Sequence, residues 1–347
     1  MPARVLAVRL GAIGDVTNAL VFAAALKEAR PDVFVGWAVH PLAQPLVEGH
    51  PCVDRVHPWR RGGGLSEFAR LVREIRGERY DVAVDLQRIQ KSAWLARLAG
   101  APRVLGYDRA RTKELSWLLT RERLDARGAT RHMVEHYLEF ARHLGAPARA
   151  PRHLLPPDAE AEAWAAHLVD GLGGAPVLVN LGASKPANRW APERFGALAR
   201  ALADDGRAVC FTGGPGDRAA AERARAAAGA GPRDLVGATS LRQLVALARR
   251  ARLFVGCDTG PMHLAAAVGT PVVALFGPAD PARTGPFGPA HLVLREHPPC
   301  APCGRKTCNQ PRHACMEDLT VERVLAAVRE RLASGAMRER PAGKTGA

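Results

Sequence analysis

Several glycine-containing segments place charged or hydroxyl side chains at spacings that could carry chemistry. The first, residues 9–15 (RLGAIGD), puts Gly14 and Asp15 where an apolar run gives way to a helical pattern. Glycines let another group approach the backbone closely, and a carboxylate is favoured at a helix N-terminus. We therefore interpret Asp15 in one of two ways. It supports the helix start, or it acts as a general base that removes a proton from a substrate.

The second segment, residues 180–193 (NLGASKPANRWAPE), also follows an apolar run and precedes a helical pattern. It gathers Ser184, Lys185 and Arg189. Guanidinium groups form paired, charge-assisted hydrogen bonds to phosphate, so this segment predicts a phosphate-binding loop. Its Pro-Glu end is equally typical of an ordinary helix start.

The third segment, residues 211–217 (FTGGPGD), is a glycine-rich turn with Gly213, Gly214 and Asp217. Such a turn either approaches a nucleotide closely or lies on the surface without a ligand. By itself it does not distinguish between these two functions.

The fourth segment, residues 256–263 (GCDTGPMH), carries the most information. Asp258, Thr259 and Gly260 end an apolar strand, and the following proline suits a helix start. The unpaired N–H groups of such a start bind anions, and His263 would lie in the first turn beside them. The alternative is that Asp258 or Thr259 only caps the helix. The recurrence of such loops at strand ends in one half of the chain favours the anion site.

Two features bear on metals. No Asp-x-Asp occurs in the chain, although a carboxylate pair at a strand end is the usual way to hold a divalent cation against a nucleoside diphosphate. We therefore predict that catalysis requires no metal cofactor and that cations and helix dipoles neutralise the diphosphate. Separately, Cys300, Cys303, Cys308 and Cys315 form a tight tract. Their spacing is compatible with a structural zinc ion, and reduced thiols or disulfides remain alternatives.

Charge indicates an anionic partner. The chain of 347 residues has 49 Lys and Arg against 34 Asp and Glu, for a net charge of +15. Residues 88–131 alone have 11 basic residues against four acidic ones. The tract is either a solvated face or a contact for nucleic acid, an acidic membrane surface or a phosphorylated substrate. The seven cysteines and the absence of a signal-peptide pattern predict a cytoplasmic location.

Alternating apolar runs and helical patterns must position these segments. Strands are predicted at 5–8, 33–39 and 82–86, with a helix at 65–76. A proline-rich stretch at 146–158 precedes a second alternating series, with strands at 177–181, 208–212, 253–255 and 272–276 and helices at 192–204, 218–228, 241–250 and 261–268. This pattern predicts an α/β fold of two Rossmann-like, doubly wound domains that face a central crevice. The predicted domains are 1–150 and 151–333, with a disordered tail at 334–347.

Several of these motifs together resemble glycosyltransferase family 9, the ADP-heptose:lipopolysaccharide heptosyltransferases. The resemblance rests on Gly11-x-x-Gly14-Asp15 combined with Asp258-Thr259-Gly260-x-x-His263, and it covers roughly residues 4–330. Further similar elements are Asp85-Leu-Gln-x-x-x-Lys91-Ser92-Ala93, Arg189-Trp190, Gly277-Pro278-x-Asp280-Pro281 and Cys315-Met316. Arg189 stands where many members of the family carry lysine.

The resemblance implies a GT-B architecture and an inverting, metal-independent transfer from an ADP-sugar. It implies that the N-terminal domain binds the acceptor and that Asp15 deprotonates the acceptor hydroxyl. The acceptor would be the anionic inner core of lipopolysaccharide, Kdo-lipid A or heptosyl-Kdo-lipid A, at the cytoplasmic face of the inner membrane. The implied acceptor-binding residues are Gly14, Arg60, Arg61 and Lys91, and the implied donor-binding residues are Ser184, Lys185, Arg189, Gly213, Gly214, Asp217, Asp258, Thr259, Gly260 and His263.

Three alternatives remain at this point. A family member with another nucleotide-sugar or acceptor, or a GT-B sugar-nucleotide epimerase, would keep the fold and change the chemistry. A nucleic-acid-binding protein would explain the positive charge. It is disfavoured because aromatic residues make up only 5% of the chain and the basic residues are dispersed over loops. We therefore predict no nucleic-acid partner.

Overall fold

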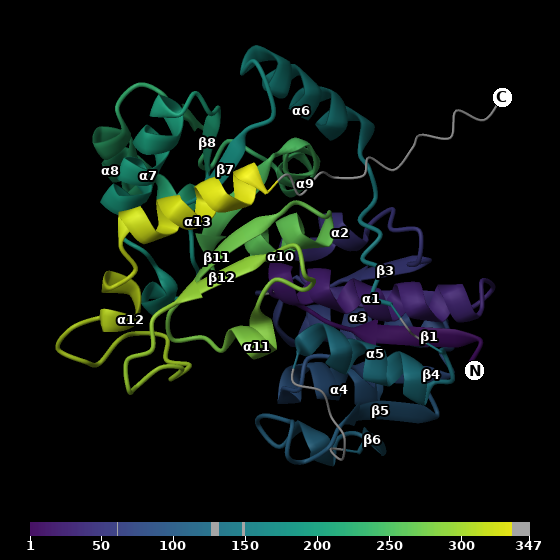
Figure 1. The fold of residues 1–347 in the computed structure, drawn as a ribbon. Helices are drawn as coiled ribbons and strands as arrows, with labels where there is room; N and C mark the ends of the chain where they lie inside the picture. Colours follow the sequence, from purple (N-terminus) through teal and green to yellow (C-terminus); the bar gives the residue numbers. More distant parts are fainter. Residues whose placement is uncertain (61, 126–131, 148–149, 335–347) are drawn as a thin grey trace. The chain divides into compact units, whose positions relative to one another are not determined.

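The chain forms two α/β units in the computed structural model, which describes residues 1–60, 62–125, 132–147 and 150–334 (Figure 1). Unit 1 comprises Met1–Asp158 together with the short segment Ala282–Thr284. Unit 2 comprises Ala159–Pro281 and the residues from Gly285 onward. The predicted α/β fold with two doubly wound domains is confirmed, and the division falls at the C-terminal end of the proline-rich stretch. The predicted tail lies outside the described residues except for Ser334.

Unit 1 is built around one parallel six-stranded sheet with the order β3-β2-β1-β4-β5-β6. This is the strand order of a Rossmann sheet. The chain adds strands outward on one side of β1 and then on the other side from β4, so the strand order reverses between β1 and β4. Its strands are β1 (Arg4–Val8), β2 (Phe34–Val39), β3 (Arg55–Pro58), β4 (Val82–Asp85), β5 (Arg103–Tyr107) and β6 (Glu122–Leu124). Its helices are α1 (Ile13–Ala29), η1 (Pro41–Ala43), α2 (Gln44–Val47), α3 (Gly64–Gly77), α4 (Gln90–Leu98), η2 (Ser116–Leu118) and α5 (Met133–His143).

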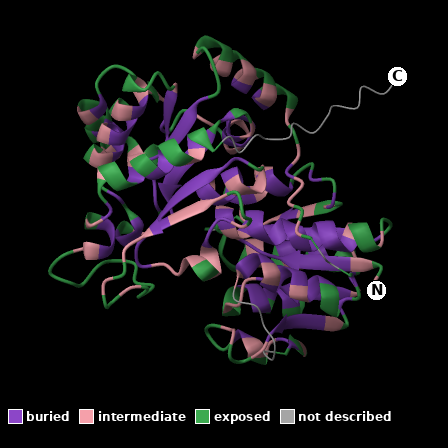
Figure 2. Cartoon of the chain, in the orientation of Figure 1, coloured by how far each residue is buried: buried purple, intermediate pink, exposed green. Residues whose placement is uncertain are grey.

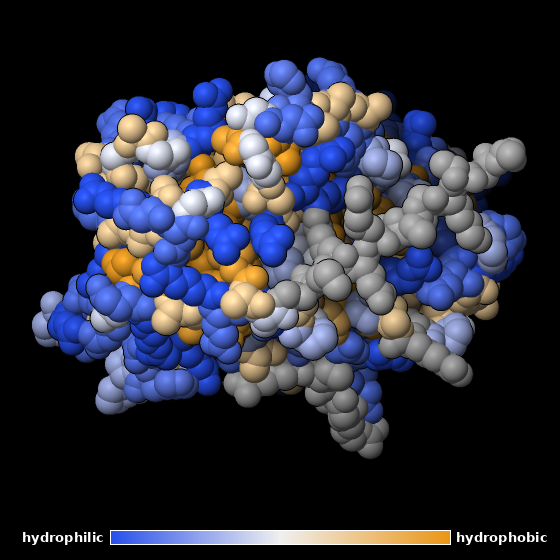
Figure 3. Space-filling model, turned by 45° about the horizontal axis from the view of Figure 1, so that its top comes forward, coloured by the Kyte–Doolittle hydropathy of each residue, from blue (hydrophilic) through white to orange (hydrophobic). Residues whose placement is uncertain are grey.

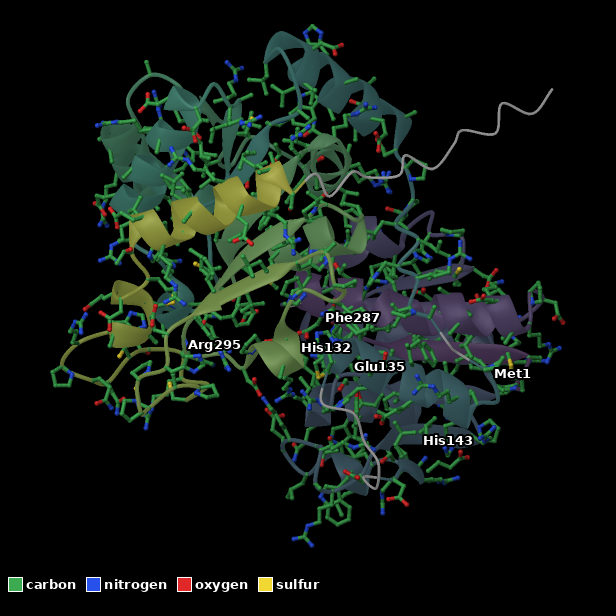
Figure 4. The ribbon with its side chains drawn as sticks, in the orientation of Figure 1. Met1, His132, Glu135, His143, Phe287 and Arg295 are labelled. Carbon is green, nitrogen blue, oxygen red and sulfur yellow. The ribbon has the colours of Figure 1, made fainter. Side chains whose placement is uncertain are left out.

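Helices cover the sheet of unit 1. Leu6 and Val8 of β1 share a buried cluster with Leu71 of α3 and Leu95 of α4, so α3 and α4 lie on the face to which these two residues point. Helices α1 and α5 contact each other. Figure 4 labels His132 just before α5, where its Nδ1 accepts the N–H of Val134 at 3.2 Å, and His143 at the end of the helix. The cap satisfies an N–H group that the first helical turn cannot pair internally.

Unit 2 repeats the architecture with the sheet order β12-β11-β10-β7-β8-β9, again all parallel, so its reversal lies between β7 and β10. Its strands are β7 (Val177–Asn180), β8 (Val209–Thr212), β9 (Arg233–Asp234), β10 (Leu253–Cys257), β11 (Val272–Phe276) and β12 (Leu292–Arg295). Its helices are α6 (Ala159–Gly171), η3 (Pro186–Asn188), α7 (Pro192–Asp204), η4 (Pro215–Asp217), α8 (Arg218–Ala228), α9 (Leu241–Arg250), α10 (Gly260–Ala267), α11 (Pro281–Thr284, shared with the unit 1 segment), α12 (Ala314–Glu317) and α13 (Val321–Ala333).

Two cores sandwich the sheet of unit 2. On one face Val179, Phe211 and Val255 share a buried cluster with residues of α7, α8 and α13. On the other face Leu178 and Phe254 share a cluster with residues of α6, α9 and α10. The sheets are therefore buried on both faces, as Figure 2 shows, which explains why their strands read as continuous apolar runs. Hydrophilic side chains dominate the face drawn in Figure 3, with smaller apolar areas between them.

The imidazole of His291, which precedes β12, is expected to make unit 2 sensitive to mild acid. Burial lowers the pKa of His291 from its ordinary value near 6.5 to about 4, although its Nε2 lies 3.1 Å from the carbonyl oxygen of Phe287. Since the unfolded chain binds a proton at this residue more readily than the folded chain, stability falls as pH drops from about 6.5 towards 4. The free energy of unfolding should therefore fall by on the order of 1 to 2 kcal/mol between pH 7 and pH 5.

Thermal unfolding at pH 7 and pH 5 tests this expectation in the wild type and in His291→Gln. The variant should lose less stability over this interval, because all other titrating groups are shared by the two proteins. Equal losses in both proteins would show that His291 does not carry the effect.

Candidate functional site

The loop between β1 and α1 presents Asp15 in the first turn of α1. One oxygen of the carboxylate, Oδ2, accepts the backbone N–H of Ala12 at 3.3 Å and lies 2.5 Å from Nη2 of Arg9. The side chain of Asp15 is 42% exposed, whereas that of Arg9 is only 7% exposed. Asp15 therefore supports the helix start, one of the two predicted interpretations, and it still presents a carboxylate at the surface of unit 1.

Arg9 was part of the motif in the sequence but was not singled out as a site residue. Burial alone would lower the pKa of Arg9. The attraction of Asp15 and of the hydroxyl groups of Tyr137 and Tyr107, together with the hydrogen bond to Asp15, outweighs burial, and the pKa is raised. A cation directly after an apolar strand was the signal that could have identified it. The buried guanidinium holds the Asp15 carboxylate in place.

A second carboxylate, Asp85, ends β4, the neighbour of β1, and is paired in register with Val8. It is 1% exposed and accepts the backbone N–H groups of Gln87 at 2.9 Å and Arg88 at 3.3 Å. Burial raises the pKa of Asp85, and these hydrogen bonds and that from Ser92 only partly oppose the effect. Asp85 thus shapes the loop beside Asp15, at the point where the strand order reverses and Rossmann sheets bind ligands.

Lys91 lies at the same edge of the sheet. It lines a small cavity of about 20 Å³, and its Nζ lies 4.4 Å from the ring centroid of Trp59. The other residues that line this cavity follow the carboxyl ends of β1 to β4, and they are Leu10, His40, Trp59, Gln87 and Ile89. Of the other predicted acceptor-binding residues, Gly14 is buried within α1 and Arg60 is exposed directly after Trp59. Arg61 lies outside the described residues.

In unit 2, the loops after β7 and β10 meet because these strands are neighbours. Nδ2 of Asn188 donates to the carbonyl oxygen of Asp258 at 3.3 Å and to its carboxylate Oδ2 at 3.2 Å. Nε2 of His263 lies 3.9 Å from Oδ1 of Asp258, and both side chains are largely buried. Asn188 is 3% exposed and was not predicted as a site residue. Its contact with Asp258 can be seen only once β7 and β10 are known to be neighbours.

The start of α10 keeps the geometry of an anion site. The helix begins at Gly260, one residue before the predicted start, and Thr259 occupies the N-cap position in an extended conformation. Thr259 thus takes the cap position that one predicted alternative gave it, although its side chain makes no capping hydrogen bond. The first N–H groups of α10 have no carbonyl partner within the helix, and N–H groups in such a position can bind an anion.

Arg189 and Asp217 come from two separate motifs and lie together. Nη2 of Arg189 is 3.9 Å from Oδ1 of Asp217, whose Oδ2 accepts the N–H of Gly214 at 2.9 Å. A Cβ atom at Gly182 would lie 2.3 Å from the Asp217 carboxylate, so a larger residue there would displace this carboxylate. Arg189 directly follows Asn188, so one short loop joins the pair Arg189–Asp217 to the pair Asn188–Asp258. Ser184 is exposed and Lys185 half-exposed on the same loop.

A cavity of about 440 Å³ in unit 2 lies beside Arg189 and Asp217. It is lined by Arg189, Trp190, Arg194, Asp217, Arg223, His313, Met316 and Glu317, among other residues. Arg223 is held by Glu193 through two hydrogen bonds of 2.6 and 2.9 Å. The size and the basic lining suit a nucleotide fragment, since such pockets combine apolar walls with a few directing polar groups. The lining residues Arg194, Arg223 and His313 were not predicted.

The cysteine tract surrounds a small cavity of its own. Cys300, Cys303, Cys308 and Cys315 all line a space of about 20 Å³ together with His313. Burial and the neighbouring thiols raise the pKa of Cys315 to about 11. All seven cysteines are free thiols, and no group of three or more His, Cys, Asp and Glu side chains among the described residues is placed to hold a metal ion. A structural zinc ion here stays a prediction.

Comparisons with known proteins agree with the motifs. Residues 68–313 match the model of glycosyltransferase family 9 (heptosyltransferase). Lipopolysaccharide heptosyltransferase 1 of Pseudomonas aeruginosa is 33% identical over 88% of this chain and 87% of its own length. Lipopolysaccharide heptosyltransferase 2 of Salmonella typhimurium is 30% identical over 90% of this chain and 94% of its own length.

Solved structures match over nearly the whole chain. ADP-heptose lps heptosyltransferase II of Escherichia coli shares 26% identity with a TM-score of 0.78, over 95% of this chain and 99% of its own. A family 9 glycosyl transferase of Veillonella parvula has a TM-score of 0.84 at 23% identity, over 96% of this chain and 98% of its own, which supports the fold alone. The predicted family and the predicted enzyme class are confirmed, and this chain belongs to glycosyltransferase family 9, the family of the heptosyltransferases.

Proposed function

We propose that this glycosyltransferase moves a heptose from ADP-heptose to the inner core of lipopolysaccharide, with inversion and without a metal cofactor. The relatives that match over most of both chains are lipopolysaccharide heptosyltransferases, and the name of one structural relative specifies ADP-heptose. The observation that carries the proposal is the partly exposed carboxylate of Asp15, held by a buried arginine at the reversal of the unit 1 sheet. The proposed acceptor is either Kdo-lipid A or heptosyl-Kdo-lipid A, and the presence of both heptosyltransferase types among the relatives supports keeping both.

Unit 2 supplies the groups that would hold the donor. The N-terminus of α10, His263, Lys185 and Arg189 offer positive charge and hydrogen-bond donors at the carboxyl edge of the sheet. A diphosphate leaving group gains negative charge as its bond to the sugar breaks, and fixed donors stabilise that charge. The predicted roles of Ser184, Gly213, Gly214, Asp217, Asp258, Thr259 and Gly260 belong to the same donor site.

Unit 1 would bind the acceptor and activate it. Asp15 takes the proton of one acceptor hydroxyl, whose oxygen attacks the anomeric carbon from the side opposite to the ADP. The bond from the anomeric carbon to the ADP oxygen breaks as the new glycosidic bond forms. One such displacement inverts the anomeric configuration. Arg60, Arg61 and Lys91 would then face the anionic groups of the acceptor.

The proposed location is the cytoplasmic face of the inner membrane, where a lipid-linked acceptor is available. Among the described residues, no helix is both long and apolar enough to span a bilayer. The positive charge of residues 88–131 supports contact with an anionic surface or acceptor, and no nucleic-acid partner is proposed.

Isothermal titration of the chain with ADP, GDP and UDP, each with and without EDTA, tests the donor half of the proposal. We expect ADP to bind most tightly and its affinity to survive EDTA, since protein cations take the role of a metal. An ADP-heptose assay with a Kdo-lipid acceptor then follows. A preference for UDP or GDP would assign another donor, and loss of binding in EDTA would contradict a metal-free site.

A further inference from the structure

Helix α4 and the neighbouring η2 expose an unusual amount of apolar surface. Among the described residues, seven large apolar side chains are more than a third exposed, and four belong to these two elements and the residue before η2. They are Trp94 at 48%, Leu98 at 38%, Leu115 at 57% and Leu118 at 59%. Since α4 and η2 are in contact, these four residues form what we call the α4–η2 face. Such grouped apolar exposure marks an interaction surface.

The arrangement of α4 explains two of the four exposed side chains. Ala93, Leu95 and Ala96 are buried against the sheet. Trp94 and Leu98 are four residues apart, so they lie on one side of the helix and are both exposed. An exposed face on a surface helix is ordinarily polar. Here it carries a tryptophan and a leucine.

The loop before η2 holds Leu115 outward in an unfavourable backbone conformation. Glu114 and Leu115 have φ angles of 55° and 56°, in a backbone region that residues other than glycine rarely adopt. The conformation is held by backbone hydrogen bonds from Lys113 to Arg88 at 2.8 Å and from Ser116 to Lys113 at 3.2 Å. Such outliers persist where the surrounding structure holds them, and they cluster at functional sites. The strained backbone here leaves the side chain of Leu115 57% exposed.

Positive charge surrounds this apolar surface. From residue 88 to residue 123 the chain has nine Lys and Arg against three acidic residues. The guanidinium carbons of Arg109 and Arg123 lie 5.6 and 5.2 Å from the ring centroid of Trp117 in η2. Of the acids, Glu122 is paired with Arg103 at 2.7 Å and Glu114 accepts the N–H of Gln90 at 3.3 Å. The surroundings of the α4–η2 face therefore carry a net positive charge.

We propose that the α4–η2 face docks unit 1 on an anionic lipid surface. Tryptophan and leucine enter the boundary between headgroups and acyl chains, and arginine and lysine bind anionic headgroups around them. Either attraction alone gives weak binding, whereas the combination is the usual requirement for a peripheral protein. The charge complementarity argues for a membrane as the occupant over a second copy of this basic chain.

The reason for this docking rests on the proposed function, because a lipid-linked acceptor would reach the enzyme from such a surface. Lys91 and Leu98 are on the same helix, seven residues apart, which at 1.5 Å per residue is about 10 Å. Helix α4 therefore connects the edge of the sheet that we assign to the acceptor with the surface that we assign to the membrane.

Co-sedimentation of the full chain with vesicles tests the proposal. The vesicles are pure phosphatidylcholine, or phosphatidylcholine with one quarter phosphatidylglycerol. Leu115→Ser/Leu118→Ser removes apolar surface from the α4–η2 face. Leu42→Ser/Leu65→Ser is the matched control, because these leucines are also in unit 1 and are 66% and 88% exposed. All four leucines are exposed, so neither variant should affect folding.

We expect the wild type and the control to bind anionic vesicles with partition coefficients within twofold of each other. The first variant should bind at least about tenfold more weakly, and neutral vesicles should bind poorly in all cases. No vesicle binding by the wild type, or equal binding by both variants, would overturn the proposal. If Leu115→Ser/Leu118→Ser lowered the molar mass in solution and left vesicle binding unchanged, the α4–η2 face would instead be a contact with a second copy of this chain. ADP affinity, measured on the same samples, reports on the proposed function independently of vesicle binding.

Discussion

Replacing Asp15 with asparagine is expected to lower the turnover number between about 100-fold and 10,000-fold, the range that loss of a general base produces. The amide keeps the size of the side chain and its hydrogen bond to Ala12, but it cannot take the acceptor proton. The residues proposed to bind the donor are all in unit 2, whereas Asp15 is in unit 1. The dissociation constant of ADP should therefore stay within a few fold of the wild type. Steady-state kinetics together with calorimetry separates the two effects.

The same substitution leaves Arg9 without its ionic partner. A buried guanidinium that loses a carboxylate destabilises a protein, although here the 42% exposure of Asp15 reduces the effect. A thermal unfolding curve must therefore accompany the kinetics, to show that the variant is folded at the assay temperature. Asp32→Asn is the matched control, because Asp32 is also a unit 1 carboxylate paired with an arginine, Arg30, at 3.0 Å. Full activity in Asp15→Asn would exclude Asp15 as the base.

Replacing Arg189 or His263 with alanine is expected to weaken ADP binding about 10-fold to 100-fold. A hydrogen bond to a charged group contributes about 1.5 to 3 kcal/mol, and every 1.4 kcal/mol changes affinity tenfold. Arg189 is 51% exposed at the mouth of the unit 2 cavity, and His263 lies in the first turn of α10. Both substitutions should raise the dissociation constant without moving the unfolding temperature by more than a few degrees.

Arg329→Ala is the control for Arg189→Ala. Arg329 is 53% exposed, is also in unit 2 and is also near an aspartate, Asp205, at 2.8 Å, but it is on α13 away from every proposed donor residue. We expect unchanged ADP affinity in this control. Wild-type affinity in both Arg189→Ala and His263→Ala would remove the donor from the place we assign to it.

Local pattern was sufficient for some elements but not for others of similar length, such as helices α5, α6 and α13. Helices α7, α8 and α9 begin and end at the predicted residues, as does β11, because an amphipathic repeat or a continuous apolar run is visible over the whole element. Strands β3, β5, β6, β9 and β12 were not predicted. Strand β9 has only two residues, Arg233 and Asp234, and β3 contains a histidine and a proline. Their partners in the sheet stabilise these segments, so local propensity does not reveal them.

The sequence by itself determined that Asp15, Asp258 and Gly260 follow strands and open helices, because glycine, proline and a carboxylate at a strand end constrain the local backbone. Only the tertiary structure decided which side chains meet there. Asp85 stands beside the Asp15 loop because β4 pairs with β1, and Asn188 reaches Asp258, 70 residues further along the chain, because β7 pairs with β10. Strand order depends on how the strands and their crossover helices pack over the whole unit, which no short segment encodes.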